Sequence, residues 1–174
     1  MARSALDLSL PAWNATIAAM RIGLLSDTHG LLRPRVLELL AGCDRILHAG
    51  DVGAPEVLEL LAAITPGVPV AAVRGNTDGG ELASLPDTVT VEIEGVPLGM
   101  VHRREDVPAR WHRSMRVVAF GHSHRPELEW RGEALWINPG ACGARRFRLP
   151  LTLAVLTFHE GRIVPEIFAV ESTI

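Results

Sequence analysis

Seven side chains that can bind metal ions follow apolar stretches at intervals along this chain. They are two aspartates, one asparagine and four histidines: Asp27, His29, Asp51, Asn76, His102, His122 and His124. Carboxylate, amide and imidazole groups without a thiolate suit manganese, iron, cobalt, nickel or zinc better than copper(I) or an iron–sulfur cluster. Metal-ion chemistry is therefore the first hypothesis for this protein.

The number of these groups indicates two metal ions rather than one. Seven ligands are too many for one ion that keeps open positions, and they suit two ions if Asp51 bridges them. Each His-containing pair has one intervening residue, so in extended backbone both members of a pair project to one side. The charges of two dications, two aspartates, a hydroxide and a phosphodiester then balance, which favours phosphate esters as substrates. Two such ions lower the pKa of a bridging water and clamp the phosphate oxygens.

Four short apolar segments must position these groups. Residues 22–25, 46–47, 68–73 and 117–120 are rich in β-branched residues, and turn residues follow each of them, so we expect buried strands. In an open α/β sheet, ligands bind beyond the carboxyl ends of the strands. The polar residues after these segments are therefore expected to converge at one edge.

The remaining elements follow from periodicity and turn signals. Helices are expected at residues 31–42, which end in glycine, and 55–64, which begin with proline. Beyond residue 78 we expect a short helix at 108–114 and three hairpins: 88–94 with 96–101, 127–130 with 134–137, and 151–158 with 162–170. A parallel half joined to an antiparallel half predicts two sheets packed face to face, with helices outside.

The chain has 174 residues, which suits one domain. We expect this domain to span residues 20–174, because the first convincing strand begins directly after Met20, and we interpret residues 1–19 as a dispensable extension. Leu10, Trp13, Ile17 and Met20 lie near helical spacing, so a short docking helix is the alternative.

Composition excludes several classes of protein. With 48% hydrophobic residues, 21% charged residues and a net charge of −3, the chain is globular and lacks bulk attraction for nucleic acid. Cys43 and Cys142 form no CxxC pair, which fits a reducing cytoplasm. No stretch approaches the roughly 18 apolar residues of a membrane span. We expect a cytoplasmic protein that acts on a small substrate, and a homo-oligomer is left open.

The motifs taken together resemble those of the calcineurin-like metallophosphoesterase superfamily. They are Asp27-x-His29, Gly50-Asp51, Gly75-Asn76-x-Asp78, His102 and Gly121-His122-x-His124. Residues 20–170 look most like its small single-domain bacterial and archaeal phosphodiesterases, which share the Ile-Asn-Pro-Gly sequence found here at 137–140.

This resemblance implies a mixed α/β (α+β) fold, a four-layer α/β/β/α sandwich of two mixed β-sheets flanked by helices. It also implies a phosphodiesterase with two divalent metal ions, manganese first and iron, nickel, cobalt or zinc as alternatives. By the resemblance, Asp27, His29, Asp51 and His124 hold the first ion. Asp51, Asn76, His102 and His122 hold the second, and Asp51, Asn76 and His102 also serve catalysis.

Two departures from the family pattern bear on catalysis. Many larger relatives have a histidine after Gly-Asn that protonates the leaving oxygen, whereas this chain has Thr77, whose hydroxyl does not titrate near neutrality. Esters with good leaving groups should therefore react fastest. The small branch commonly has His-Gly-His where this chain has His102, Arg103 and Arg104. The two arginines are interpreted either as phosphate ligands or as solvated loop residues.

Other polar residues have ordinary structural interpretations. Asp78 is expected to cap the next segment rather than orient a ligand, and His48 to be a partly buried histidine outside the site. Arg145 and Arg146 are expected to face solvent. Asn138 is expected to satisfy backbone groups in its own turn.

Two alternatives to a phosphodiesterase remain. A relative of this fold in the eukaryotic retromer coat is regarded as chiefly a protein-binding subunit whose site has lost ligands, so a non-catalytic scaffold is the second hypothesis. The complete ligand set here favours catalysis. A nuclease is disfavoured by the negative net charge.

Overall fold

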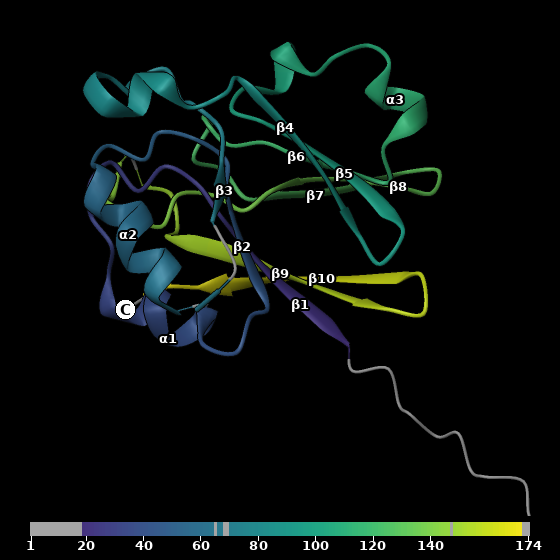
Figure 1. Ribbon diagram of the computed structural model, residues 1–174, viewed down its shortest axis with the longest axis horizontal. Coiled ribbons are helices and arrows are strands. Elements are labelled where there is room, and N and C mark those ends of the chain that lie inside the picture. Colours follow the sequence, from purple (N-terminus) through teal and green to yellow (C-terminus); the bar gives the residue numbers. More distant parts are fainter. Residues whose placement is uncertain (1–18, 65, 68–69, 147, 172–174) are drawn as a thin grey trace, which may run out of the picture.

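Two five-stranded β-sheets form the framework of the protein (Figure 1). The computed structural model describes residues 19–64, 66–67, 70–146 and 148–171. The strand order is β10-β9-β1-β2-β3 in the first sheet and β4-β5-β6-β8-β7 in the second. The mixed two-sheet sandwich expected from the sequence is confirmed.

In the first sheet, three parallel strands meet an antiparallel hairpin. The parallel strands are β1 (Met20–Leu25), β2 (Arg45–His48) and β3 (Ala71–Ala72). The hairpin of β9 (Thr152–His159) and β10 (Arg162–Ala169) adds to the other edge of β1. The expected strand at 68–73 is reduced to β3, and residues 68–69 lie outside the described residues.

The second sheet also combines both strand directions. Its central strands β5 (Val96–Val101), β6 (Val117–Ala119) and β8 (Ala134–Asn138) are parallel. The edge strands β4 (Thr88–Ile93) and β7 (Glu127–Arg131) are each antiparallel to a neighbour. All three hairpins are therefore confirmed, but the expected separation into a parallel half and an antiparallel half is wrong.

The reason lies in the burial of β9. Its first six residues are apolar or small and almost all buried, so the strand needs neighbours on both sides and cover on both faces. A central position between β1 and β10 satisfies this requirement. The C-terminal hairpin consequently completes the first sheet.

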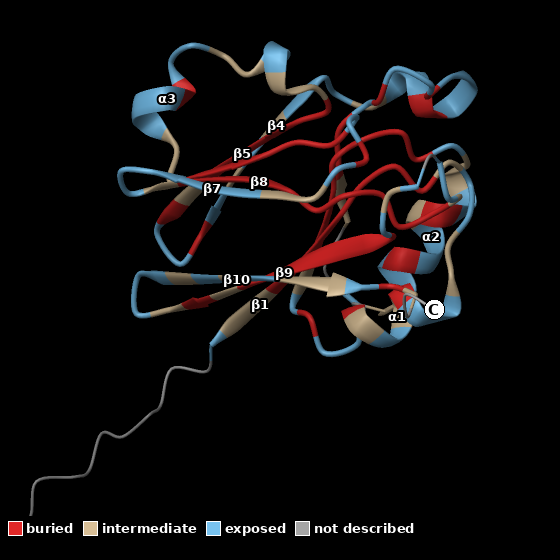
Figure 2. Cartoon of the chain, turned by 180° about the vertical axis from the view of Figure 1, so that it is seen from behind, coloured by how far each residue is buried: buried red, intermediate tan, exposed pale blue. Residues whose placement is uncertain are grey.

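Three apolar clusters lie between the layers, and Figure 2 shows in red the buried segments of the sheets and helices. The largest cluster lies between the sheets. A second packs the first sheet against α1 (Pro34–Leu40) and α2 (Pro55–Ile64). A third lies under α3 (Trp111–Ser114) on the outer face of the second sheet and includes Trp111, Val118 and Trp136. Alternation along β6 supports this division, since Val117 and Ala119 face the first cluster and Val118 faces the third.

The helix expected at 55–64 is confirmed as α2, whereas the other two expected helices are shorter than the sequence pattern suggests. The helix expected at 31–42 is α1, which begins at Pro34 because proline occupies its first turn. The helix expected at 108–114 is the single turn α3. Two 3₁₀ segments, η1 (Gly80–Ser84) and η2 (Arg104–Asp106), complete the described elements. None of the described helices has the length and apolar character needed to cross a lipid bilayer. The docking-helix alternative concerns residues 10–20, of which all but the last two lie outside the described residues.

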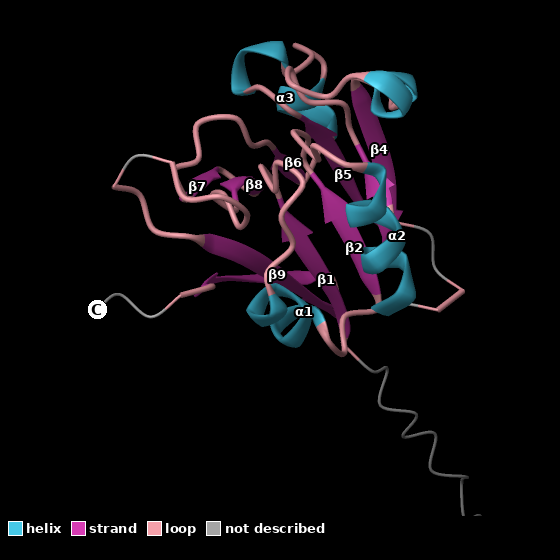
Figure 3. Cartoon of the chain, turned by 90° about the vertical axis from the view of Figure 1, so that its left-hand side faces the viewer, coloured by secondary structure: helices cyan, strands magenta, loops and turns pink. Residues whose placement is uncertain are grey.

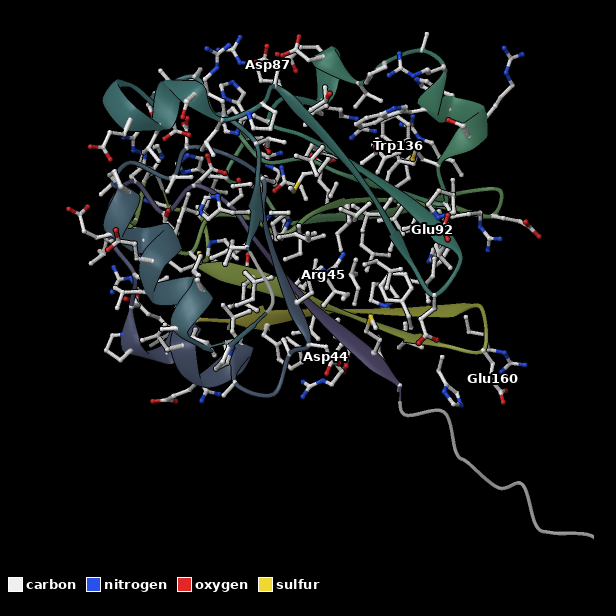
Figure 4. The ribbon with its side chains drawn as sticks, in the orientation of Figure 1. Asp44, Arg45, Asp87, Glu92, Trp136 and Glu160 are labelled. Carbon is white, nitrogen blue, oxygen red and sulfur yellow. The ribbon has the colours of Figure 1, made fainter. Side chains whose placement is uncertain are left out.

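The parallel strands of both sheets end at the same rim of the molecule (Figures 1 and 3). In Figure 4, Asp87 marks this rim where β4 begins, while Glu92 and Glu160 lie toward the opposite end, near the hairpin turns. The loops that follow β1, β2, β3 and β6 therefore meet at one place, as the sequence predicts, and the loop after β5 joins them there.

Candidate metal centre

One group of metal-binding side chains consists of Asp27, His29 and His124, whose donor atoms lie within 4.8 Å of one another. The two histidines face each other, with 3.3 Å between their Nε2 atoms. His124 Nε2 is also 3.3 Å from Asp27 Oδ1. These segments are about 95 residues apart in sequence and meet only because β1 and β6 belong to different sheets that end at the same rim.

A second group consists of Asp27, Asp51 and His102, again within 4.8 Å. His102 Nε2 lies 3.0 Å from Asn76 Oδ1 and 3.5 Å from Asp51 Oδ1. The ring of His122 stands edge-on to that of His102, with 5.2 Å between centroids. The structure thus brings all seven predicted ligands to the rim.

The carboxylate of Asp51 lies between the two groups. Its Oδ2 is 3.9 Å from His29 Nε2 in the first group, and its Oδ1 is 3.5 Å from His102 Nε2 in the second. Asp27 belongs to both groups as well. The geometry is compatible with the bridging role expected for Asp51. It also places Asp27 in both groups, whereas the sequence analysis assigned Asp27 to the first ion alone.

The hydrogen bonds of His102 indicate that a cation fits between the side chains of the second group. Its Nδ1 lies 2.8 Å from the carbonyl oxygen of Ala49, so Nδ1 must carry the proton and donate it. In the neutral ring, Nε2 then presents a lone pair to the oxygens of Asn76 and Asp51. Three lone pairs that converge require a cation between them, and histidine ligands of metals usually donate the other ring N–H to a carbonyl or carboxylate.

A proton can partly substitute for such a cation. Burial lowers the pKa of His102, but its hydrogen bonds to Asp51 and Ala49 and the charge of Asp27 outweigh this effect, so its pKa lies above the ordinary value. Burial raises the pKa of Asp51, yet hydrogen bonds from His102 and the Thr77 backbone hold it well below the ordinary value.

Asp27 gives a second test of whether a cation fits. Its carboxylate is fully buried, and Oδ2 accepts a hydrogen bond from the His122 backbone at 3.1 Å. Its Oδ1 is buried but has no hydrogen-bond partner among the described residues. Because an unsatisfied buried carboxylate oxygen is strongly destabilising, the residues present fit a bound metal ion.

The ligand pairs do not lie on extended backbone, so that expectation is wrong. Asp27, His29, Asp51, His122 and His124 all have positive φ, between 47° and 68°. Non-glycine residues adopt this left-handed conformation at a cost of about 1–2 kcal/mol each, which persists only where surrounding contacts enforce it. Left-handed turns, rather than strand alternation, direct these side chains into the site.

Backbone hydrogen bonds between the loops enforce these turns. Asp27 N donates to Gly50 O at 3.0 Å, and His29 N donates to Asp51 O at 3.0 Å. Gly121 N donates to His102 O at 2.9 Å. Backbone hydrogen bonds therefore join the loop after β1 to the loop after β2, and the loop after β5 to the loop after β6.

Glycine permits the closest of these approaches. A Cβ on Gly75 would lie 2.1 Å from Asp51 Oδ1, and a Cβ on Gly121 would lie 1.9 Å from Ser26 Oγ. Both distances are far shorter than any real contact of a Cβ atom. The glycines that precede Asn76 and His122 are therefore required by packing between loops.

Two buried residues that the sequence placed outside the site support its loops. The Asp78 carboxylate accepts hydrogen bonds from Gly53 N at 2.9 Å and Gly75 N at 2.8 Å, and it does not cap the following 3₁₀ helix. The expected capping role is thus wrong. The sequence did contain a signal for this supporting role, because Asp78 is a polar residue within three residues of the predicted ligand Asn76.

His48 is completely buried rather than partly buried. Its Nδ1 accepts from Gly50 N at 3.2 Å, and Nε2 lies 2.9 Å from the hydroxyl of Thr28, which itself donates to Val52 O. His48 therefore orients the residue between Asp27 and His29. Asn138 satisfies its own turn as expected, through Gly140 N at 2.9 Å, and also donates to Gly121 O at 2.7 Å.

Arg103 and Arg104, which the sequence analysis treated together, have different surroundings in the structure. Arg104 bonds to Glu127 at 2.5 Å and Glu129 at 2.8 Å, and its guanidinium lies over the rings of Phe120 and Trp136. Its charge is already neutralised on the outer face of the second sheet, so a phosphate contact by Arg104 is not supported. Arg103 lines a cavity of about 340 Å³ together with Asn76 and His102.

Arg146 is exposed, as expected, but it also borders the site. It lines a cavity of about 490 Å³ with Asp51, Asn76, Thr77, His122, Ser123 and His124. Burial lowers the pKa of His29, and the positive charge of Arg146 is the next largest cause. Arg145 next to it pairs with Glu171. No local pattern distinguishes these two arginines, because only the course of the loop separates them.

Comparison with known proteins agrees with the geometry. A family model described as a calcineurin-like phosphoesterase superfamily domain matches residues 20–161. A probable metallophosphoesterase of Methanocaldococcus jannaschii is 30% identical over 164 residues, covering 84% of this chain and 81% of the relative. Phosphodiesterase YfcE of Escherichia coli K12 is 32% identical over 164 residues, covering 79% of this chain and 87% of that enzyme.

Among solved structures, vacuolar protein sorting 29 of Cryptosporidium parvum superimposes with a TM-score of 0.69 at 20% identity. The match covers 87% of this chain and 98% of that one. At this identity the similarity concerns the fold alone.

Proposed function

Since the chain belongs to the calcineurin-like phosphoesterase superfamily, we propose that it is a phosphodiesterase that depends on two divalent metal ions and hydrolyses small phosphate esters. The convergence of lone pairs from His102 Nε2, Asn76 Oδ1 and Asp51 Oδ1 is the observation that carries this proposal. A proton on His102 Nε2 substitutes for a metal ion at this position only in part.

The proposed ligand sets are those that the family resemblance implies, and the two groups described above support them in part. Asp27, His29, Asp51 and His124 hold one ion, and Asp51, Asn76, His102 and His122 hold the other. The contacts of His29 and His102 with opposite oxygens of Asp51 support its bridging role. Oxygen and imidazole donors support manganese first, with iron, nickel, cobalt or zinc as alternatives.

Divalent ions held by these residues supply Lewis-acid chemistry, in which they activate the attacking water and neutralise the phosphate oxygens. The residues of the chain supply orientation. Ala49 fixes the ring of His102 through Nδ1, and the Thr77 backbone N–H, 2.9 Å from Asp51 Oδ1, fixes that carboxylate. Asp51, Asn76 and His102 are therefore the proposed catalytic residues.

Substrate binding is proposed for Arg103 rather than Arg104. Both follow His102, but the guanidinium of Arg104 is held by two carboxylates of β7. Over the described residues the structure gives Arg103 no carboxylate partner, and its side chain lines a cavity with ligands Asn76 and His102. A phosphate oxygen would provide the missing partner.

The completeness of the donor set favours an enzyme over a scaffold. Binding of a partner protein requires an exposed surface and places no demand on buried, strained ligands. Here five proposed ligands adopt left-handed backbone, and Asp27 keeps an unsatisfied buried oxygen. Strain of this kind accumulates at functional sites.

A cytoplasmic location is proposed on the basis of the cysteines. Cys43 and Cys142 are both free and buried. A reducing compartment maintains free thiols of this kind.

Hydrolysis assays with metal-free protein test the proposed function. Bis(p-nitrophenyl) phosphate and p-nitrophenyl phosphate are offered to the stripped protein and to protein resupplied with each dication. We expect no activity without metal, restoration by Mn²⁺, and faster hydrolysis of the diester.

The variant Asp51→Asn should lose at least about 100-fold in kcat/KM and bind less metal, because an amide cannot bridge two cations as a carboxylate does. The matched control is Glu92→Gln, on β4 at the opposite end of the molecule (Figure 4), which should behave as the unchanged protein. Activity that resists chelation and survives Asp51→Asn would refute the two-metal proposal.

A further inference from the structure

A second cavity adjoins the one that contains the metal ligands. It has a volume of about 390 Å³ and is lined by Ser123, Arg125, Arg148 and Leu149. Ser123 also lines the cavity of the metal ligands. The two cavities therefore share a wall at the residue between His122 and His124.

Positive charge gathers on this side of the site. In the described part of the chain, the structure gives no carboxylate partner to Arg125, Arg146 or Arg148, whereas Arg33, Arg104 and Arg145 are all paired. The whole chain has a net charge of −3, so three unneutralised arginines beside one site are a local departure from its overall charge. Such a cluster attracts an anion.

The shared wall is firmly held. Ser123 Oγ accepts hydrogen bonds from Asn138 Nδ2 at 3.1 Å and from Arg125 N at 3.3 Å. Asn138 is itself fully buried and also bonds to Gly121 O. The backbone of Arg125 is therefore tied to the loop that carries His122 and His124, and its position relative to the site is defined.

The chemistry of the adjoining cavity matches a phosphate group. Two guanidinium groups can each offer paired N–H donors to phosphate oxygens, and Ser123 supplies a hydroxyl. Leu149 adds an apolar wall, on which a sugar or another uncharged linker can rest. Arg146, which lines the first cavity, lies on the same loop as Arg148 and extends the positive charge toward the metal ligands.

We propose that the substrate is a phosphodiester carrying a second phosphate group, with the reacting diester at the metal ligands beside Arg146 and the second phosphate in the cavity of Arg125 and Arg148. This inference rests on the proposed function and specifies its substrate class.

A matched pair of substrates tests the inference. Thymidine 5′-(p-nitrophenyl phosphate) and the same compound with a 3′-phosphate share one reacting diester and one leaving group. We expect the added phosphate to raise kcat/KM by about 10-fold or more, the effect of one or two charge-assisted hydrogen bonds. In the double variant Arg125→Gln, Arg148→Gln, the ratio between the two substrates should fall toward one.

The control variant is Arg162→Gln, at the start of β10, which should keep the ratio of the unchanged protein. Equal rates for the two substrates, or a ratio that the double variant leaves intact, would overturn the inference while the phosphodiesterase proposal stands. Hydrolysis of neither substrate with any dication would instead reject the phosphodiesterase proposal.

A binding measurement tests the second-phosphate site even if the protein hydrolyses neither substrate. Calorimetry of Mn²⁺-loaded protein compares thymidine 3′,5′-bisphosphate with thymidine 5′-monophosphate. The bisphosphate should bind about 10-fold more tightly, and the double variant should remove this preference. Equal affinity for both nucleotides would reject the second-phosphate site regardless of catalysis.

Discussion

At the scale of single residues, His48 shows how a buried histidine supports the site without facing it. The Gly50 backbone N–H occupies Nδ1, so the ring is neutral with its proton on Nε2, which donates to Thr28. Burial is the largest effect on this ring and lowers its pKa to about 4. Protonation of His48 would break the contact with Gly50, beside Asp51.

His48 should therefore make the metal-free protein less stable in weak acid. The unfolded chain binds a proton near pH 6.5 and the folded chain only near pH 4, so stability is lost as the pH falls through this window. At pH 5 the loss should be about 2 kcal/mol relative to pH 7.5. Urea unfolding of the unchanged protein and of His48→Gln, at both pH values, measures it.

The exposed His112 provides the matched control for this measurement. His112→Gln should keep the pH dependence of the unchanged protein, whereas His48→Gln should reduce it by about 2 kcal/mol. An identical pH dependence in all three proteins would show that His48 is not the group responsible.

Thr77 determines which leaving groups the proposed enzyme can expel. It lines the cavity of the metal ligands, and its hydroxyl cannot donate a proton as a general acid near neutral pH. The residues that line this cavity with Thr77 include His122 and His124, but as proposed metal ligands they are not free to protonate an alkoxide.

Aryl phosphodiesters should accordingly react at least about 100-fold faster than alkyl phosphodiesters, because general acid catalysis typically contributes about 10²–10⁴-fold. The variant Thr77→His introduces the acid that larger relatives carry, so it should reduce the ratio of the aryl to the alkyl hydrolysis rate. Comparable rates on both ester types in the unchanged protein would instead point to an acid elsewhere in the site.

At the scale of elements, the site depends on loops whose backbones touch. The loop after β3 approaches that after β2 at Gly75, where no side chain separates the backbone from Asp51. Asp78 secures the same two loops through Gly53 and Gly75. The position of Asp51 is thus set by the packing of loops and not by β2 alone.

Gly75→Ala should therefore displace Asp51. The new Cβ would lie 2.0 Å from Asp51 N, so the loops must separate, and a shift of about 1 Å in a positioned group can reduce activity by about 100-fold. Kinetics and metal content measure the effect, and circular dichroism establishes that the variant is folded. Gly79→Ala is the control, since a Cβ there meets nothing within 4 Å. Equal losses in both variants would contradict the packing argument.

At the scale of the whole molecule, the two sheets act together. The first sheet contributes the loops with Asp27, Asp51 and Asn76, and the second contributes those with His102 and His124. The apolar cluster between the sheets therefore fixes the position of one half of the site relative to the other. Neither sheet alone carries a complete set of ligands.

A chain that begins at Met20 should retain both the fold and the proposed activity. Among the residues that the structure describes, both sheets and the three apolar clusters draw only on residues from Met20 onward. The family model also begins at residue 20. Deletion of residues 1–19, with retention of Met20, should change Tm by less than about 2 °C and leave kcat/KM within about twofold. A large fall in Tm would favour the docking-helix alternative.

The sequence by itself determined which residues could act and where they stand relative to the strands. Buried strands are short apolar runs, and turn residues mark their ends, so Asp27, Asp51 and His122 could be placed after strands from local pattern alone. The three hairpins were equally predictable, because each carries a local turn signal such as Glu94-Gly95.

Only the tertiary structure decided how these residues meet. The left-handed turns at the ligands, the link that Asp78 makes between two loops, and the different surroundings of Arg104 and Arg146 arise from contacts between distant segments. So does the central position of β9. Local periodicity reports which face of an element is apolar, whereas the partner of a polar side chain depends on backbone that arrives from another part of the chain.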